Sequence, residues 1–363
     1  MIGKVSFKKR NMTFKFNMSV NAGVESACYA LGSTLCDFTA VSPSISQKLF
    51  HVLRKKFVAD ISTRLDTPTI GAYVPFLRKA LDTNPYLFIY LKFYAECLVH
   101  SCSRKDDLPL LLKKFISEQT AERNLSGIIA LADPTQYAEW LGRILIDDME
   151  FRRNRLKQQL SCIVTGNDGF QNYTPKQRFF ILMHEADSGL DRRFKVNLSC
   201  DYGFQPNANL GTIKAALLES KTELCQEYEI DTPDDLISIE LFKTVFYNLP
   251  VKICRCCGEF FVPPGRSDSE YCSRINPPEE KRCSQIGAMR TLNEKYSGNP
   301  VYAEYTRAYK RNHSRLRNGK LYEEEFKKWS AAARTARDEY IKNNKSASEY
   351  KDFLAQLEAD MAQ

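Results

Sequence analysis

Five of the twelve cysteines lie close together in the last third of the chain, within "ICRCCGEFFVPPGRSDSEYCSRINPPEEKRCSQIGAMR". Cys254 and Cys257 have the C-x2-C spacing of a zinc knuckle, in which the backbone bends round the metal and the glycine that follows relieves the bend. Fourteen residues separate Cys257 from Cys272, which is enough for a short hairpin, and ten more separate Cys272 from Cys283. We expect a helix to begin at Cys283, where its N-terminus would favour an anionic thiolate.

Four ligands complete a tetrahedral site, so one of the five cysteines has to be excluded. Cys256 stands between the two knuckle cysteines, and the loop that turns their sulfur atoms inward should turn its thiol outward. The predicted ligands are therefore Cys254, Cys257, Cys272 and Cys283. Thiolates favour zinc over harder metals, and four protein ligands leave no position for water, so we expect one structural zinc ion. An iron–sulfur cluster, or cysteines that bind no metal, are the alternatives.

This stretch resembles the CGNR zinc finger of bacteria. The shared features are a knuckle, an aromatic hairpin, Tyr-Cys-Ser and a last cysteine that opens a basic helix. They are carried here by Cys254, Cys257, Gly258, Phe261, Tyr271, Cys272, Ser273 and Cys283. CGNR fingers are presumed to bind DNA in transcriptional regulators, so the resemblance implies a treble-clef-like finger that binds DNA. The chain departs from that pattern, because "SQIGAMR" replaces Gly-Asn-Arg and "RINPPEEKR" lengthens the last loop. It is more similar to an uncharacterised bacterial family whose members end in such a finger followed by charged helices.

A strongly basic segment follows the last cysteine. Residues 281–320 contain ten Lys and Arg against two acidic residues, Glu294 and Glu304, so this segment has a net charge of +8. The net charge of the whole chain is also +8. Arginines recur four residues apart on one predicted helix face, where like charges repel unless an anion neutralises them. We therefore predict nucleic-acid binding, with DNA favoured over RNA. The predicted contacts are Arg282, Gln285, Arg290, Arg307, Arg311 and Arg315.

A second interpretation of this segment stays open. The acidic stretch "YEEEFKKWS" lies just downstream and could pair with the basic helices. The finger would then be a structural staple or a protein-interaction module that binds no nucleic acid. Tyr302, Tyr305 and Tyr309 are interleaved with the arginines, and on the nucleic-acid interpretation they could pack on a sugar or a base.

The elements that must position these residues are mostly helical. Residues 5–7 and 12–20 alternate in hydrophobicity about the turn "KKRN" and predict a small N-terminal β-hairpin, and from about Val24 the period becomes helical. Three later helices have a cap followed by proline, at Asp133-Pro134, Thr174-Pro175 and Thr232-Pro233. The fold class we predict is mainly α with that hairpin, a treble-clef-like finger and charged helices at the end.

Four segments are expected along the chain. Turn-rich stretches at 165–172 and 200–211, and the change to charged helix formers after Gly287, suggest the boundaries. Residues 1–165 would hold the hairpin and a helical domain, 166–249 a helical continuation, 250–297 the finger and 298–363 a charged tail. The tail should form two helices broken near "RNGK" and a last helix over 348–361, capped by Ser346 and Glu349.

Composition narrows the functional class. The most apolar stretch, "YLFIYLKFYAECLVH", is interrupted by Lys92 and Glu96 and is shorter than a membrane span, and no secretion signal is visible, so we expect a cytoplasmic protein with reduced thiols. The four histidines are scattered, and no Walker loop, G-x-G-x-x-G or G-x-S-x-G occurs. We therefore expect a regulator whose body, residues 1–249, senses a ligand or a protein partner, rather than an enzyme.

Overall fold

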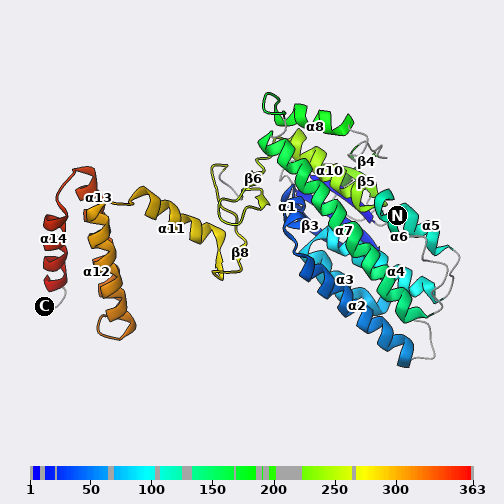
Figure 1. Cartoon of the computed structure of the whole chain (residues 1–363), viewed down its shortest axis with the longest axis horizontal. Coiled ribbons are helices and arrows are strands. Elements are labelled where there is room, and N and C mark those ends of the chain that lie inside the picture. The colour runs from blue at the N-terminus through cyan, green and yellow to red at the C-terminus, as the bar shows by residue number, and fades with distance from the viewer. Residues whose placement is uncertain are drawn as a thin grey trace, which may run out of the picture. The chain divides into compact units, whose positions relative to one another are not determined.

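The computed structural model divides the chain into two compact units, Met1–Ser273 and Arg274–Gln363 (Figure 1). The residues it describes are 3–8, 13–20, 23–63, 69–102, 107–124, 133–166, 169–184, 190, 196–201, 223–263 and 267–360. The expected loop at 200–211 lies outside the described residues from residue 202 onward. The prediction of a mainly helical chain with a small antiparallel β element is confirmed.

The β element of the first unit is larger than a hairpin. The expected strands, β1 (Gly3–Lys8) and β2 (Thr13–Val20), pair as predicted. β3 (Gly23–Ala30), β4 (Val196–Asp201) and β5 (Glu223–Ile230) extend them into one antiparallel sheet in the order β3-β2-β1-β5-β4. Val5 lies opposite Phe16 on one side and Tyr228 on the other, and all three side chains are buried.

The helical period expected from about Val24 was wrong, because residues 23–30 form β3. This strand pairs with β2 along its whole length, from Val20 opposite Gly23 to Thr13 opposite Ala30. Exposure along it has the period of a strand, since Ala27 and Tyr29 are half-buried while Cys28 is exposed. These two half-buried positions hold a small residue and a polar-tipped one, so the alternation in hydrophobicity over residues 26–30 is weak although the alternation in burial is clear.

Besides this sheet and a short hairpin near its end, the described residues of the first unit form ten helical segments. They are α1 (Ser33–Ala40), α2 (Pro43–Thr63), η1 (Ile70–Tyr73), α3 (Val74–Thr83), α4 (Pro85–Ser101), α5 (Leu108–Phe115), α6 (Glu118–Asn124), α7 (Pro134–Thr165), α8 (Pro175–His184) and α10 (Pro233–Phe246). Helix α4 contains the most apolar stretch and is buried along almost its whole length, so that stretch lies within the core of this unit. None of the described helices is long and apolar enough to cross a membrane.

The three cap-and-proline signals are confirmed as helix starts. Helices α7, α8 and α10 begin at Pro134, Pro175 and Pro233. Asp133 Oδ1 accepts a hydrogen bond from the Thr135 N–H at 3.0 Å, and Thr232 forms a reciprocal capping box with Asp235. In each case the side chain satisfies an N–H group that the first turn leaves without a helical partner.

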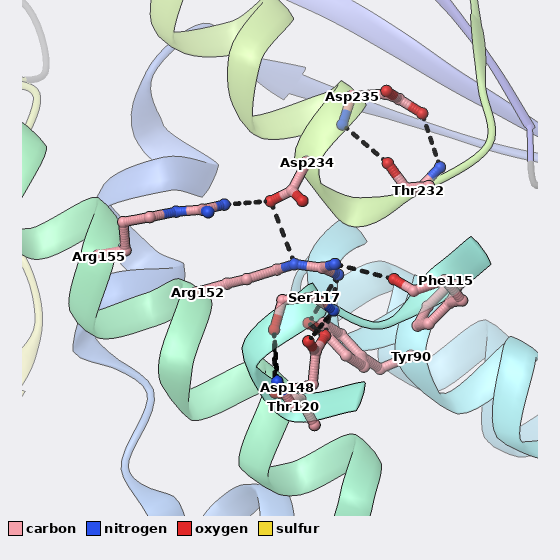
Figure 2. Close-up of polar contacts among 10 residues, drawn as sticks. All are labelled: Tyr90, Phe115, Ser117, Thr120, Asp148, Arg152, Arg155, Thr232, Asp234 and Asp235. Atoms are coloured by element: carbon pink, nitrogen blue, oxygen red, sulfur yellow. Dashed lines mark hydrogen bonds and ion pairs between the residues drawn. The ribbon is translucent and has the colours of Figure 1, made fainter. Parts of the chain in front are cut away.

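A buried network of charges ties α7 to α4, α5 and α10 (Figure 2). Arg152 of α7 is 2% exposed, and its guanidinium contacts Asp148 at 2.9 Å and Asp234 at 3.1 Å. It also donates to the carbonyl of Phe115 at 2.8 Å and contacts the Tyr90 hydroxyl at 3.2 Å. Arg155 of α7 also pairs with Asp234 at 2.5 Å, so two guanidinium groups balance the two carboxylates and no buried charge of the network is left unpaired.

Another buried acid, Glu240 of α10, caps the start of α1. Its Oε1 accepts from the Gly32 N–H at 2.9 Å, and its Oε2 accepts from the hydroxyls of Thr34 at 2.5 Å and Tyr86 at 2.8 Å. Complete burial raises the pKa of this carboxyl to about 7, although the hydrogen bonds to Thr34, Tyr86, Leu35 and Gly32 oppose the rise.

Glu240 should therefore make the stability of the first unit depend on pH. The native carboxyl keeps its proton to a higher pH than the unfolded one, so its contribution is fully present below about pH 4.5 and is lost as the pH rises through about 7. That contribution is on the order of 3 kcal/mol. In Glu240→Gln it should disappear, because the side-chain amide does not titrate in this range and the two hydroxyls can still donate to its oxygen. Urea unfolding of both proteins at several pH values measures it, and parallel pH profiles would refute it.

The second unit contains two short strands and four helices in its described residues. The strands are β8 (Ile275–Asn276) and β9 (Lys281–Arg282), and the helices are α11 (Cys283–Lys295), α12 (Pro300–Arg317), α13 (Glu323–Lys342) and α14 (Ala347–Asp360). The predicted helix break near "RNGK" and the predicted last helix are both confirmed. Helices α12, α13 and α14 pack round their own core, centred on Trp329, Ala333 and Tyr350.

Candidate metal centre

The knuckle of the candidate site is built by a two-stranded hairpin of the first unit. Strands β6 (Lys252–Ile253) and β7 (Phe260–Phe261) pair antiparallel, and the chain turns between them through the two knuckle cysteines. The Gly258 N–H donates to the Cys254 carbonyl at 2.8 Å, and Gly258 has a φ of +74°. Only glycine adopts this backbone conformation at little cost, which is why it follows the second cysteine.

The four predicted cysteines come together in the structure. The sulfur atoms of Cys254, Cys257, Cys272 and Cys283 all lie within 4.8 Å of one another, and three of these residues are buried while Cys257 is half-buried. The Cys283 N–H donates to the Arg274 carbonyl at 2.9 Å, next to the β8–β9 hairpin, and α11 begins at Cys283. Cys256 is not a member of this group.

The spacing of the sulfur atoms fits a tetrahedral metal ion. A Zn–S bond of about 2.3 Å places the sulfur atoms of a regular tetrahedron about 3.8 Å apart. The sulfur atoms of Cys257 and Cys272 are 3.7 Å apart, and the remaining distances within the group do not exceed 4.8 Å. Four cysteines of this arrangement could hold one metal ion and leave no coordination position open for a substrate.

Backbone N–H groups of the knuckle are directed at one of the sulfur atoms. The N–H groups of Cys256 and Cys272 each lie 3.4 Å from the Cys254 sulfur. Burial by itself would raise the pKa of this thiol, but hydrogen bonds from the backbone of Cys272, Cys257 and Cys256 lower it to about 7. The fold thus favours the thiolate form, which is the form that binds metal.

The knuckle hairpin is also packed onto the body of the first unit. Phe260 is a member of the main hydrophobic core, and β7 lies against α1. Lys157 of α7 forms an ion pair with Glu259 at 3.0 Å, directly beside the hairpin. The knuckle is therefore held against the body of the first unit by apolar packing and by one ion pair.

The six predicted nucleic-acid contacts lie in the second unit, and most have partners within it. Gln285 Oε1 accepts from the Arg282 N–H at 3.3 Å as part of a helix cap. Four arginines contact nearby side chains, as Arg290 with Glu279 at 3.2 Å, Arg307 with Glu304 at 2.6 Å, Arg311 with Glu358 and Arg315 with Asn312 at 3.3 Å. Arg307, with 72% of its side chain exposed, is more accessible than Arg290 and Arg311.

A different basic row emerges on α12. Arg307, Lys310 and Arg317 are exposed and occur at spacings of three and seven residues, which places them on one helix face. Neither Lys310 nor Arg317 forms an ion pair with any residue that the structure describes. The spacing of this row is visible in the sequence, but it is less regular than the four-residue repeat of Arg307, Arg311 and Arg315.

The interleaved tyrosines pack inside the second unit. Tyr305 is buried in the core, and the guanidinium of Arg337 lies over the rings of Tyr296, Tyr302 and Tyr305. Tyr309 packs against Phe326 and Trp329. These rings therefore stabilise the helical bundle. Packing within the bundle explains their spacing without a role in stacking on a base.

The C-terminal part of the chain is similar to a known protein family. Residues 204–361 are similar to DUF6076, a family of unknown function, and this range includes the four cysteines and every helix that follows them. The similarity agrees with the expectation of an uncharacterised family, whereas the finger has no family match of its own. No curated protein and no solved structure matches the chain.

Proposed function

We propose that the protein is a zinc-containing nucleic-acid-binding protein that acts in the cytoplasm. One zinc ion would be held by Cys254, Cys257, Cys272 and Cys283 in a treble-clef-like finger, and its role would be structural because four thiolates complete its coordination. In this proposal the second unit binds nucleic acid, DNA in the first place, and the first unit senses a ligand or a partner. A transcriptional regulator is the class of protein that combines these features.

The observation that carries the nucleic-acid proposal is the exposed row on α12. Arg307, Lys310 and Arg317 occupy one face, and two of them have no acidic partner among the described residues. Such a row follows a phosphate backbone well, since each cation that neutralises a phosphate releases a counterion. Of the residues predicted from the sequence, Arg307 is part of this row, while Arg311 and Arg315 would assist from its edge.

A gel-shift assay at several salt concentrations tests this proposal. The triple variant Arg307→Gln/Lys310→Gln/Arg317→Gln should bind duplex DNA at least ten times more weakly, and its salt slope should fall by about one unit for each phosphate that it no longer neutralises. Lys327→Gln/Lys328→Gln on α13, with Lys113→Gln on α5, is the charge-matched control and should bind like the parent. No binding by the parent at low salt would refute the proposal.

The competing function is a metal-stapled module that binds no nucleic acid. The ion pairs of Arg290, Arg307 and Arg311 favour it, as does the packing of Phe260 into the main core. This alternative predicts that the parent protein shows no affinity for DNA or RNA. It also predicts that Arg311→Gln lowers the melting temperature, because Glu358 on α14 is left without this arginine.

A further inference from the structure

A cleft of about 410 Å³ lies in the first unit between α2 and α7, far in sequence from the cysteines. Its volume is within the range of small-molecule sites. Its floor is formed by Phe50 and Tyr94, both buried, whose ring centroids are 5.1 Å apart. Ile146 of α7 adds a further apolar wall. A ligand for this cleft therefore needs an apolar or aromatic body.

The floor of the cleft is fixed by a glycine of α7. The Tyr94 hydroxyl donates to the Ala138 carbonyl at 2.7 Å, and a Cβ on Gly142 would come within 3.3 Å of that hydroxyl. A glycine inside a helix costs roughly 1 kcal/mol relative to alanine, so its presence in this 32-residue helix calls for a reason. Here it lets the Tyr94 hydroxyl lie close against α7.

The rim of the cleft is cationic. Lys48, His51 and Arg54 of α2 face Arg143 of α7, and Glu139 is the one carboxylate among the described lining residues. Glu139 pairs with Arg54 at 3.2 Å, and His51 Nδ1 lies 3.3 Å from the same guanidinium. Lys48 and Arg143 form no ion pair with any described residue. The positive charges of Lys48 and Arg143 thus lie next to an apolar floor and have no counter-ion in the described part of the chain.

We infer that this cleft binds a small amphipathic organic anion, a carboxylate with an aromatic or branched apolar body. The carboxylate would lie between Lys48 and Arg143, where a charge-assisted hydrogen bond is strong, and the apolar body would cover Phe50 and Tyr94. This inference deepens the sensing role proposed for the first unit. It does not depend on the metal or on nucleic acid, so it can fail while those proposals stand.

Saturation-transfer NMR on the full chain, without nucleic acid, tests this inference. The probes are benzoate, neutral benzyl alcohol and cationic benzamidine, which share one ring and differ in charge. Benzoate should bind with a dissociation constant of about 1 mM, as its size allows, and the other two at least ten times more weakly. Absence of benzoate binding, or equal binding of benzoate and benzyl alcohol, would overturn the inference.

Two variants locate the binding of benzoate. Lys48→Gln/Arg143→Gln should weaken it about tenfold, and Ser44→Trp should block the cleft without changing its charge. Lys113→Gln/Lys114→Gln on the exposed face of α5 removes the same charge elsewhere and should bind benzoate like the parent. Undiminished binding in both cleft variants, or an equal loss in the α5 control, would contradict this assignment.

Discussion

Cys272→Ser and Cys283→Ser should each abolish metal binding and unfold the finger. The parent protein should hold one zinc ion per chain, and each variant should hold none, because three thiolates no longer close the site. The finger has few core residues of its own, and the binding energy of a structural zinc ion, about 10–16 kcal/mol in finger peptides, then supplies much of its folding energy. Elemental analysis measures the metal, and the amide NMR signals of the knuckle report its folding.

Cys256→Ser is the matched control for this experiment. It changes a cysteine of the same loop that lies outside the sulfur cluster, so metal content and knuckle signals should stay as in the parent. Loss of the metal in Cys256→Ser together with its retention in Cys254→Ser would show that the wrong cysteines have been assigned. Iron and acid-labile sulfide in the parent would instead identify an iron–sulfur cluster, which the same four thiolates could hold.

Arg152→Ala should destabilise the first unit by about 3–5 kcal/mol. The change leaves Asp148 buried without a counter-ion and leaves Asp234 with Arg155 alone, and it removes the donor to the Phe115 carbonyl. Residues of α4, α5, α7 and α10 all contact this guanidinium (Figure 2), so the loss should affect the whole unit rather than one helix. Urea unfolding followed by far-UV circular dichroism gives the change in free energy.

Lys157→Gln is the control for the buried network. Its ion pair with Glu259 also starts from α7, but both side chains are about one-third exposed, and such pairs contribute at most about 1 kcal/mol. A loss below about 1 kcal/mol in Arg152→Ala would contradict the role assigned to the network, since an uncompensated buried charge costs more than that.

The sequence predicted those features that depend on neighbouring residues. The knuckle could be predicted because Cys254, Cys257 and Gly258 lie within five residues of one another. Their spacing and the positive φ that only glycine adopts easily are local properties of the chain. The helix starts at Pro134, Pro175 and Pro233 followed from caps that act on the next turn. The break between α12 and α13 followed in the same way from "RNGK".

Features that join distant residues could not be predicted in this way. β5 completes the sheet against β1 although more than two hundred residues separate them, and no local pattern announces that pairing. Arg311 meets Glu358 through the packing of α12 on α14, so its availability for a partner depended on the tertiary fold. In the sequence, Arg152 does not differ from the other charged residues of α7. Its pairing with Asp234 depends on the position of α10, which only the tertiary fold determines.

The pairing of β1 with β5 has a consequence for how the protein folds during synthesis. β1 ends at Lys8 and β5 begins at Glu223, so at the usual rate of roughly 5–20 residues per second the ribosome makes β5 on the order of 10–40 s after β1. Throughout this interval β1 can pair with β2 on one side and has an open hydrogen-bonding edge on the other. Open edges of this kind pair with other chains, so nascent chains that stall before residue 223 should be the aggregation-prone species of this protein.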